Sequence, residues 1–144
     1  MRKILIYSRE DFEKLSFNDN DYYIPINPSH GPYLDPILED SNTVCNLYFE
    51  DVLEDGERID PIYGKHTAKA IDKENAKKLI QFANDISENA NVHIHCTHGE
   101  SRSPAVGLFL TEYYKQDDRQ FMKLNNFDTI DGFNATVLRV LRES

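Results

Sequence analysis

The sequence has few cysteines, no long apolar run and no internal repeat, and each absence excludes a class of protein. Its two cysteines, Cys45 and Cys96, lie far apart and do not make a disulfide framework, which predicts a reducing, cytoplasmic setting. The apolar run near the N-terminus is cut off by charged residues almost at once, and no later stretch is long enough to span a bilayer. We therefore expect neither a signal peptide nor association with a membrane.

Basic residues are also scarce. The chain has 16 lysines and arginines against 25 aspartates and glutamates, which gives a net charge of −9. A nucleic-acid backbone is a polyanion, so this balance argues against a nucleic acid as the general partner. Any anion site must then be a local positive pocket on an acidic body.

Low-complexity tracts and flexible linkers are absent, so we expect residues 1–144 to form a single domain. Apolar stretches predict strands at 3–7, 22–26, 43–49 and 92–96, whereas the very acidic stretch 50–60 is expected to be a loop. Helices are predicted at 9–15 after a Ser8 cap, from an Asp72 cap to about Asn89, and at 103–114, 117–125 and 133–142. Alternating strands and helices indicate an α/β fold with a central, mostly parallel sheet of about four strands flanked by helices.

The stretch 93-HIHCTHGESRSP-104 contains three histidines and a cysteine, all of them residue types that bind zinc. Side chains alternate along a strand, however, so His93 and His95 are expected on one face and Cys96 on the other. His30 and His66 lie alone in predicted loops, where surface histidines are common. We therefore expect no metal site and no cofactor.

The same stretch has the features of an anion site. Cys96 ends a predicted strand, and the loop after it closes on the N-terminus of the next helix, a position where active sites of parallel sheets lie. Gly99 permits the positive φ that such a loop needs, so that backbone N–H groups can converge on an oxyanion. The helix N-terminus adds positive potential, and Arg102 can grip two phosphate oxygens.

This environment bears on the chemistry of Cys96. A free cysteine has a pKa of about 8.5, which falls to about 3.5–7.5 at a helix N-terminus beside a cation. Cys96 is therefore predicted to be a thiolate that attacks phosphorus and forms a cysteinyl-phosphate, which water then hydrolyses. The competing interpretation is a buried structural cysteine, which leaves the glycine, the arginine and the following Ser103 without a purpose.

Residues 95-HCTHGESRS-103 resemble the signature His-Cys-x5-Arg-Ser/Thr of the cysteine-dependent protein tyrosine phosphatases. The chain length is similar to that of the compact dual-specificity branch and its small bacterial and phage members, and the resemblance extends from about residue 43 to the end. Rhodaneses have a loop one residue shorter, and low-molecular-weight phosphatases carry their motif near the N-terminus, so neither fits as well.

The resemblance implies a role for each position of the motif. Cys96 would be the nucleophile, Arg102 the phosphate clamp, and Ser103 the group that stabilises the departing thiolate. His95 would support the loop and help to lower the cysteine pKa. The phosphate-binding loop would comprise Thr97, His98, Gly99, Glu100, Ser101 and Arg102.

A phosphatase of this family also needs a general acid, an aspartate on a mobile loop before the signature. Tryptophan is absent, which excludes the Trp-Pro-Asp loop of the larger enzymes. The candidates are Asp51, Asp55 and Asp60, and any of them could instead belong to a solvated acidic face. Asp51 is favoured because it follows a predicted strand directly and because 47-LYFEDV-52 resembles the Phe-x-Asp ending of the small members.

The sequence thus predicts a phosphatase acting on phosphotyrosine, with phosphoserine and phosphothreonine as further candidates, in a phosphorylated protein or a small phosphomonoester. The run Cys-Thr-His-Gly also resembles RNA 5′-triphosphatases, although these continue with Arg-Thr and need a basic surface. A phosphate-binding module without turnover is the non-enzymatic alternative. The absence of lysine from the loop disfavours polyphosphoinositides.

Two further residues are considered. If the strands at 43–49 and 92–96 are neighbours, Cys45 could protect Cys96 from over-oxidation through a reversible disulfide; otherwise it is a small buried hydrophobe. Asn134 lies at the start of a C-terminal helix that resembles the last helix of the family, and it receives no role. The sequence leaves the oligomeric state open.

Overall fold

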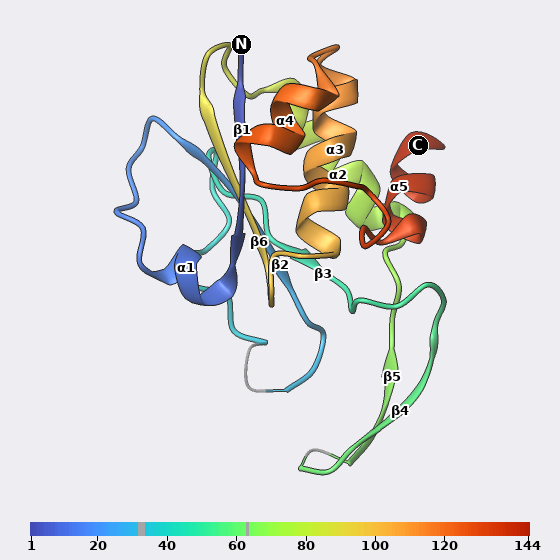
Figure 1. Ribbon diagram of the computed structural model, residues 1–144. Coiled ribbons are helices and arrows are strands. Elements are labelled where there is room, and N and C mark those ends of the chain that lie inside the picture. The colour runs from blue at the N-terminus through green and yellow to red at the C-terminus, as the bar shows by residue number, and fades with distance from the viewer. Residues whose placement is uncertain (32–33, 63) are drawn as a thin grey trace.

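The computed structural model describes residues 1–31, 34–62 and 64–144 (Figure 1). The strands are β1 Lys3–Ser8, β2 Tyr22–Asn27, β3 Leu47–Tyr48, β4 Gly56–Asp60, β5 Gly64–Ala68 and β6 Asn91–Cys96. The helices are α1 Arg9–Glu13, α2 Lys73–Asn84, α3 Arg102–Tyr113, α4 Asp118–Leu124 and α5 Ala135–Arg142. None of the helices so described is long and apolar enough to cross a bilayer.

Four parallel strands form the central sheet in the order β1-β6-β2-β3. The predicted α/β fold with a parallel sheet of about four strands is therefore confirmed. β6 lies between β1 and β2, and Cys96 pairs with Ser8, so that β1 and β6 end side by side. The motif that follows Cys96 thus begins at the carboxyl edge of the sheet, as predicted.

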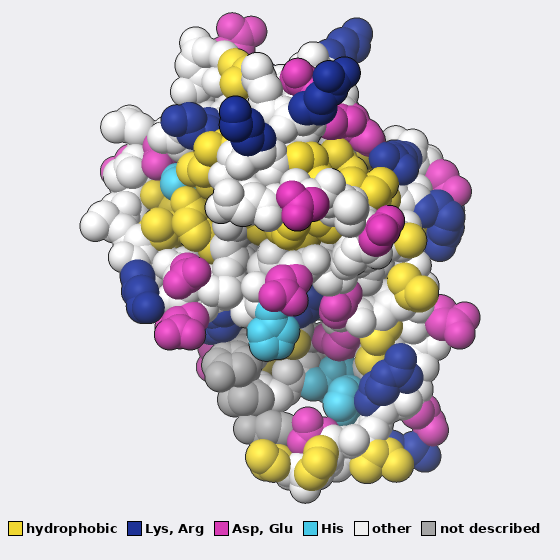
Figure 2. All heavy atoms as spheres, in the orientation of Figure 1, with side chains coloured by type: hydrophobic (Ala, Val, Ile, Leu, Met, Phe, Trp, Pro, Cys, Tyr) yellow, Lys and Arg dark blue, Asp and Glu magenta, His cyan; other side chains and the backbone are white. Residues whose placement is uncertain are grey.

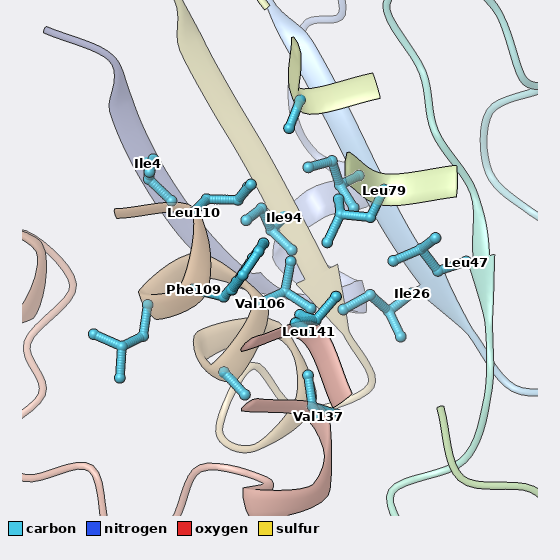
Figure 3. Packing of buried hydrophobic residues seen from close by; sticks show 14 of the residues in the cluster. Ile4, Ile26, Leu47, Leu79, Ile94, Val106, Phe109, Leu110, Val137 and Leu141 are labelled. Atoms are coloured by element: carbon cyan, nitrogen blue, oxygen red, sulfur yellow. The ribbon is translucent and has the colours of Figure 1, made fainter. Parts of the chain in front are cut away.

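The two faces of the sheet are covered unequally. In Figure 1, α2 to α5 lie on one side of the sheet and α1 lies on the other. Ile94 of β6 packs in the main core with Leu79 of α2, Val106 of α3 and Leu141 of α5 (Figure 3). α3 is buried from Arg102 to Thr111 and is the central helix of this layer.

Side-chain caps fix the starts of two helices where the sequence predicts them. Ser8 Oγ accepts a hydrogen bond from Asp11 N at 3.1 Å, and Asp72 Oδ1 accepts one from Asn75 N at 2.9 Å. These bonds pair backbone donors that the first turn of a helix leaves unsatisfied. α2 ends at Asn84, one turn earlier than predicted, because the Asp85 N–H turns back to the Phe82 carbonyl in the terminal turn.

The predicted strand at 43–49 is mostly wrong. Leu47 and Tyr48 alone form β3, and Val44 contributes an isolated bridge to Tyr23. The ladder is interrupted opposite Pro25 of β2, which has no N–H to donate to this segment, although the Cys45 N–H still donates to the Tyr23 carbonyl at 2.9 Å. The backbone groups of Asn46 face away from β2 and bond to side chains: its N–H donates to Asp40 Oδ1 at 2.7 Å and its carbonyl accepts from Lys78 Nζ at 2.6 Å.

The predicted loop at 50–60 is also wrong in part, since β4 occupies its second half. β4 pairs with β5 in an antiparallel hairpin, which we call the β4–β5 arm, and the arm projects away from the rest of the molecule (Figure 1). Most of its residues are exposed on both faces, so the sequence carries no alternation of apolar and polar residues from which a strand could be predicted.

Candidate active site

The loop 97–101 joins the end of β6 to the start of α3 and surrounds Cys96, which is 2% exposed. Cys96 Sγ lies 3.1 Å from Ser103 Oγ and accepts a hydrogen bond from Gly99 N at 3.3 Å. Two donors of the motif therefore lie within reach of the sulfur. Both groups would stabilise the negative charge that Sγ carries as a thiolate.

Gly99 is required by the path of this loop. Its φ is +73°, and a Cβ placed on it would lie 2.7 Å from Tyr7 C and 2.8 Å from both Tyr7 O and Ser8 N. These atoms are backbone at the end of β1 and cannot move aside as a flexible side chain could. The loop is further tied to the same chain segment by the Arg9 N–H, which donates to the Thr97 carbonyl at 3.1 Å.

Arg102 is the first residue of α3, and only 6% of it is exposed. Its Nη1 donates to the Phe49 carbonyl at 2.8 Å and its Nη2 donates to Thr97 Oγ1 at 2.9 Å. A guanidinium has five N–H donors in a rigid plane, so these two bonds orient it and leave further donors for an anion. The backbone just after β3 and the loop 97–101 therefore both hold this cation in place.

A cavity of about 470 Å³ opens over this loop. Its lining residues are Asp51, Cys96, Thr97, His98, Glu100, Ser101, Arg102 and Gly132. A larger cavity, of about 680 Å³, lies between α2 and α5, but its walls hold no cysteine or histidine. The smaller cavity is the candidate active site because it contains the candidate nucleophile, Cys96, together with the buried cation of Arg102.

Of the three aspartates considered, Asp51 lies in the cavity with Cys96. Asp51 Oδ1 accepts hydrogen bonds from Ser101 Oγ at 2.7 Å and from Asn134 Nδ2 at 2.9 Å. Asp55 Oδ1 accepts from Ala70 N at 2.9 Å, and Asp60 Oδ1 accepts from Ile62 N at 2.7 Å. Asp55 therefore joins the two ends of the β4–β5 arm, Asp60 stabilises a local turn, and neither lines the cavity.

His95 lies beneath the loop and is 1% exposed. Burial lowers its pKa to about 4; the bond to the Cys96 carbonyl opposes this shift, and the charges of Arg9 and Arg102 add to it. The imidazole is therefore neutral at pH 7, and its Nδ1 donates to the Cys96 carbonyl at 3.2 Å. His95 can thus fix the backbone at Cys96, but it does not supply a positive charge there.

Three of the other histidines contact side chains of the protein, and His98 lines the cavity. His93 Nε2 lies 2.8 Å from Asp21 Oδ2, and its Nδ1 lies 2.7 Å from Tyr7 Oη. His30 and His66 were expected to lie alone, but they contact each other, with ring centroids 4.4 Å apart. Within residues 1–31, 34–62 and 64–144, no group of three or more His, Cys, Asp or Glu is placed to hold a metal ion.

The condition for a disulfide between Cys45 and Cys96 is not met. β2 lies between β3 and β6, and two inter-strand spacings amount to roughly 10 Å, which exceeds the Cα separation of about 7 Å that a disulfide tolerates. Both thiols are free. Burial raises the pKa of Cys45 to about 12, with opposing smaller effects of Lys78 and Asp40, so Cys45 is a buried apolar residue.

Asn134 is the site residue that the sequence did not identify. It is the N-cap of α5, and its Oδ1 accepts from Val137 N at 3.1 Å. An asparagine before an apolar helical run indicates a cap, which is a local signal. Its bond to Asp51 joins residues 83 positions apart and has no such signal.

Comparison with protein-family models, with curated proteins and with solved structures gave no match for this chain.

Proposed function

We propose that this protein is a phosphatase that hydrolyses phosphotyrosine through a cysteinyl-phosphate intermediate, with phosphoserine and phosphothreonine as further substrates. The observation that carries the proposal is one cavity that holds Cys96 at its floor, the guanidinium of Arg102 beside it, and Asp51 in its wall. A nucleophile, an anion clamp and an acid are the three groups that hydrolysis of a phosphomonoester requires.

In the first step the phosphate oxygens are bound by Arg102 and by backbone N–H groups of the loop. Cys96 Sγ attacks phosphorus, the bond from phosphorus to the ester oxygen breaks, and Asp51 gives its proton to that oxygen as it leaves. In the second step Asp51 takes a proton from water, the water oxygen attacks phosphorus, and the phosphorus–sulfur bond breaks. Ser103 Oγ and Gly99 N, at 3.1 Å and 3.3 Å from Sγ, stabilise the thiolate that is released.

The walls of the cavity favour a phosphomonoester over a more highly charged group. Besides Arg102, they carry the carboxylates of Asp51 and Glu100, and the net charge of the chain is −9. A triphosphate at the end of RNA would bring several further negative charges to this acidic surface. We therefore expect a phosphotyrosyl peptide to release phosphate at least tenfold faster than a triphosphate-ended RNA, which corresponds to a difference of about 1.4 kcal/mol. The opposite order would favour an RNA 5′-triphosphatase.

The test of the proposed function is hydrolysis of para-nitrophenyl phosphate under reducing conditions. Wild type and Cys45→Ser should release nitrophenol at similar rates, because Cys45 lies outside the cavity. Cys96→Ser should lose all measurable activity, because a serine hydroxyl is far less ionised than a thiol. An inactive wild-type protein that still binds phosphate would instead indicate a phosphate-binding module.

The role of Asp51 is tested by the quality of the leaving group. Asp51→Asn cannot protonate a departing oxygen, so its kcat/KM on phenyl phosphate should fall by about 10²-fold or more, while kcat/KM on dinitrophenyl phosphate, which reports the first step alone, falls much less. Asp55→Asn is the matched control and should follow wild type on both esters. Loss of phenyl phosphate hydrolysis in Asp55→Asn, with Asp51→Asn unaffected, would assign the acid to Asp55.

A further inference from the structure

Asn134 connects three parts of the molecule through one buried side chain and its own backbone. Its Nδ2 donates to Asp51 Oδ1 at 2.9 Å and to the Val52 carbonyl at 3.2 Å. Its backbone N–H donates to the Ser101 carbonyl at 3.1 Å, and its Oδ1 caps α5. Asn134 therefore holds together the start of α5, the segment that contains Asp51 and Val52, and the phosphate-binding loop.

Both described donors to the Asp51 carboxyl group bind the same oxygen. Ser101 Oγ and Asn134 Nδ2 donate to Oδ1, and no described residue bonds to Oδ2. An oxygen that accepts two hydrogen bonds is a poor place for a proton, because the protonated form would be a donor facing two donors. The proton of a neutral Asp51 therefore belongs on Oδ2.

The segment that carries Asp51 is anchored on both sides of it. The Phe49 carbonyl accepts from Arg102 Nη1 at 2.8 Å, and the Leu53 carbonyl accepts from Thr136 Oγ1 at 2.7 Å. Thr136 lies on the same helix as Asn134 and supports the same segment, but it makes no bond to the Asp51 side chain. Both residues therefore support the backbone of this segment, at Val52 and at Leu53, but of the two Asn134 alone also bonds the Asp51 carboxyl group.

We propose that Asn134 is a positioning residue that, together with Ser101, fixes Oδ1 of Asp51 so that Oδ2 delivers the proton to the leaving group. The inference rests on the proposed function, since it assigns a task to the acid of that reaction. It also implies that the acid is already in place before substrate binds, because residues at the N-terminus of α5 hold it there.

The experiment compares Asn134→Ser with Thr136→Val on two esters. Serine keeps an oxygen that can cap α5 but does not extend to Asp51, so the helix start survives while the bond is lost. We expect kcat/KM on phenyl phosphate to fall about tenfold or more, and kcat/KM on dinitrophenyl phosphate to change less than about threefold, because only the poor leaving group needs the proton. Thr136→Val should keep the wild-type ratio of the two rates.

A double-mutant cycle provides the second readout, which a purely structural role would not move. In the Asp51→Asn background, Asn134→Ser should cause no further loss on phenyl phosphate, because the two residues act through one proton transfer. A further tenfold loss, or an equal loss on both esters, would overturn the inference while leaving the phosphatase intact. Hydrolysis that persists in Cys96→Ser would overturn the proposed function itself, and the inference with it.

Discussion

Gly99 shows how closely the loop 97–101 is fitted to its neighbours. Its positive φ and the backbone atoms of Tyr7 and Ser8, within 2.8 Å of a Cβ, leave no room for a side chain. Gly99→Ala should therefore displace the loop from β1, destabilise the fold by about 1–3 kcal/mol and abolish hydrolysis. Thermal unfolding and a nitrophenyl phosphate assay measure both effects.

Gly132 offers the matched control, because a Cβ there would meet only the Glu100 carbonyl at 3.7 Å and its φ is not positive. Gly132→Ala should unfold within about 0.5 kcal/mol of wild type. Equal stability of the two variants would show that the loop does not need glycine at position 99.

His95 predicts a pH dependence of stability. Its folded pKa of about 4 lies below the ordinary value of about 6.5, so the unfolded chain binds the proton first as the pH falls. The stability is therefore complete above about pH 6.5 and is lost as the pH falls toward 4, by about 3 kcal/mol in all. Denaturant unfolding of wild type and His95→Gln at pH 7 and pH 4.5 isolates this share, since the carboxylates titrate in both proteins. Parallel losses in the two proteins would contradict the assignment.

Residue identities in the motif were predictable because the chemistry is contiguous. Cys96, Gly99, Arg102 and Ser103 lie within eight positions, and one strand end and one helix start bring them together. Asp51 could be favoured over Asp55 and Asp60 from its place after a predicted strand, but only the packed chain places it beside Ser101. Asn134 was missed for the same reason, because a cap signal says nothing about which distant carboxylate the other end of the amide meets.

At the scale of elements, the parallel sheet and the β4–β5 arm differ in what stabilises them. β6 is buried on both faces between β1 and β2, whereas the strands of the arm pair with each other. Apolar side chains are exposed at the free end of the arm (Figure 2), where Ile59 and Ile62 are 82% and 81% exposed. The sheet was predictable because buried strands leave apolar runs, and the arm was not because exposed strands leave none.

This difference predicts unequal costs of removing apolar side chains. Ile59→Ser and Ile62→Ser remove no buried surface and should change the free energy of unfolding by less than about 0.5 kcal/mol each. Leu141→Ala of α5, a fully buried residue, should cost about 2–5 kcal/mol through lost burial and a cavity. Urea unfolding measures both. A cost above about 2 kcal/mol at Ile59 would show that the arm is packed against the body.

At the scale of the whole molecule, an acidic chain places the buried cation Arg102 in the cavity where we propose that phosphate binds. Arg102 is held by Phe49 from the strand side and by Thr97 from the loop, and Asp51 reaches the same cavity from a segment supported by α5. Five parts of the chain thus converge at the carboxyl edge of the sheet: the end of β1, the segment 49–53, the loop 97–101, and the starts of α3 and α5. The candidate site is therefore a product of the fold, although its candidate nucleophile can be identified from nine residues of sequence.

The most direct test of the central claim is detection of phosphate on Cys96. Asp51→Asn is mixed with dinitrophenyl phosphate, quenched in denaturant during the first turnovers, digested and analysed by mass spectrometry. The good leaving group permits attack by Cys96, while loss of the base that activates water slows the second step, so the phosphoryl adduct should accumulate on Cys96 above its wild-type level. Release of phosphate without any adduct on Cys96, or with the adduct on another residue, would contradict the proposed mechanism.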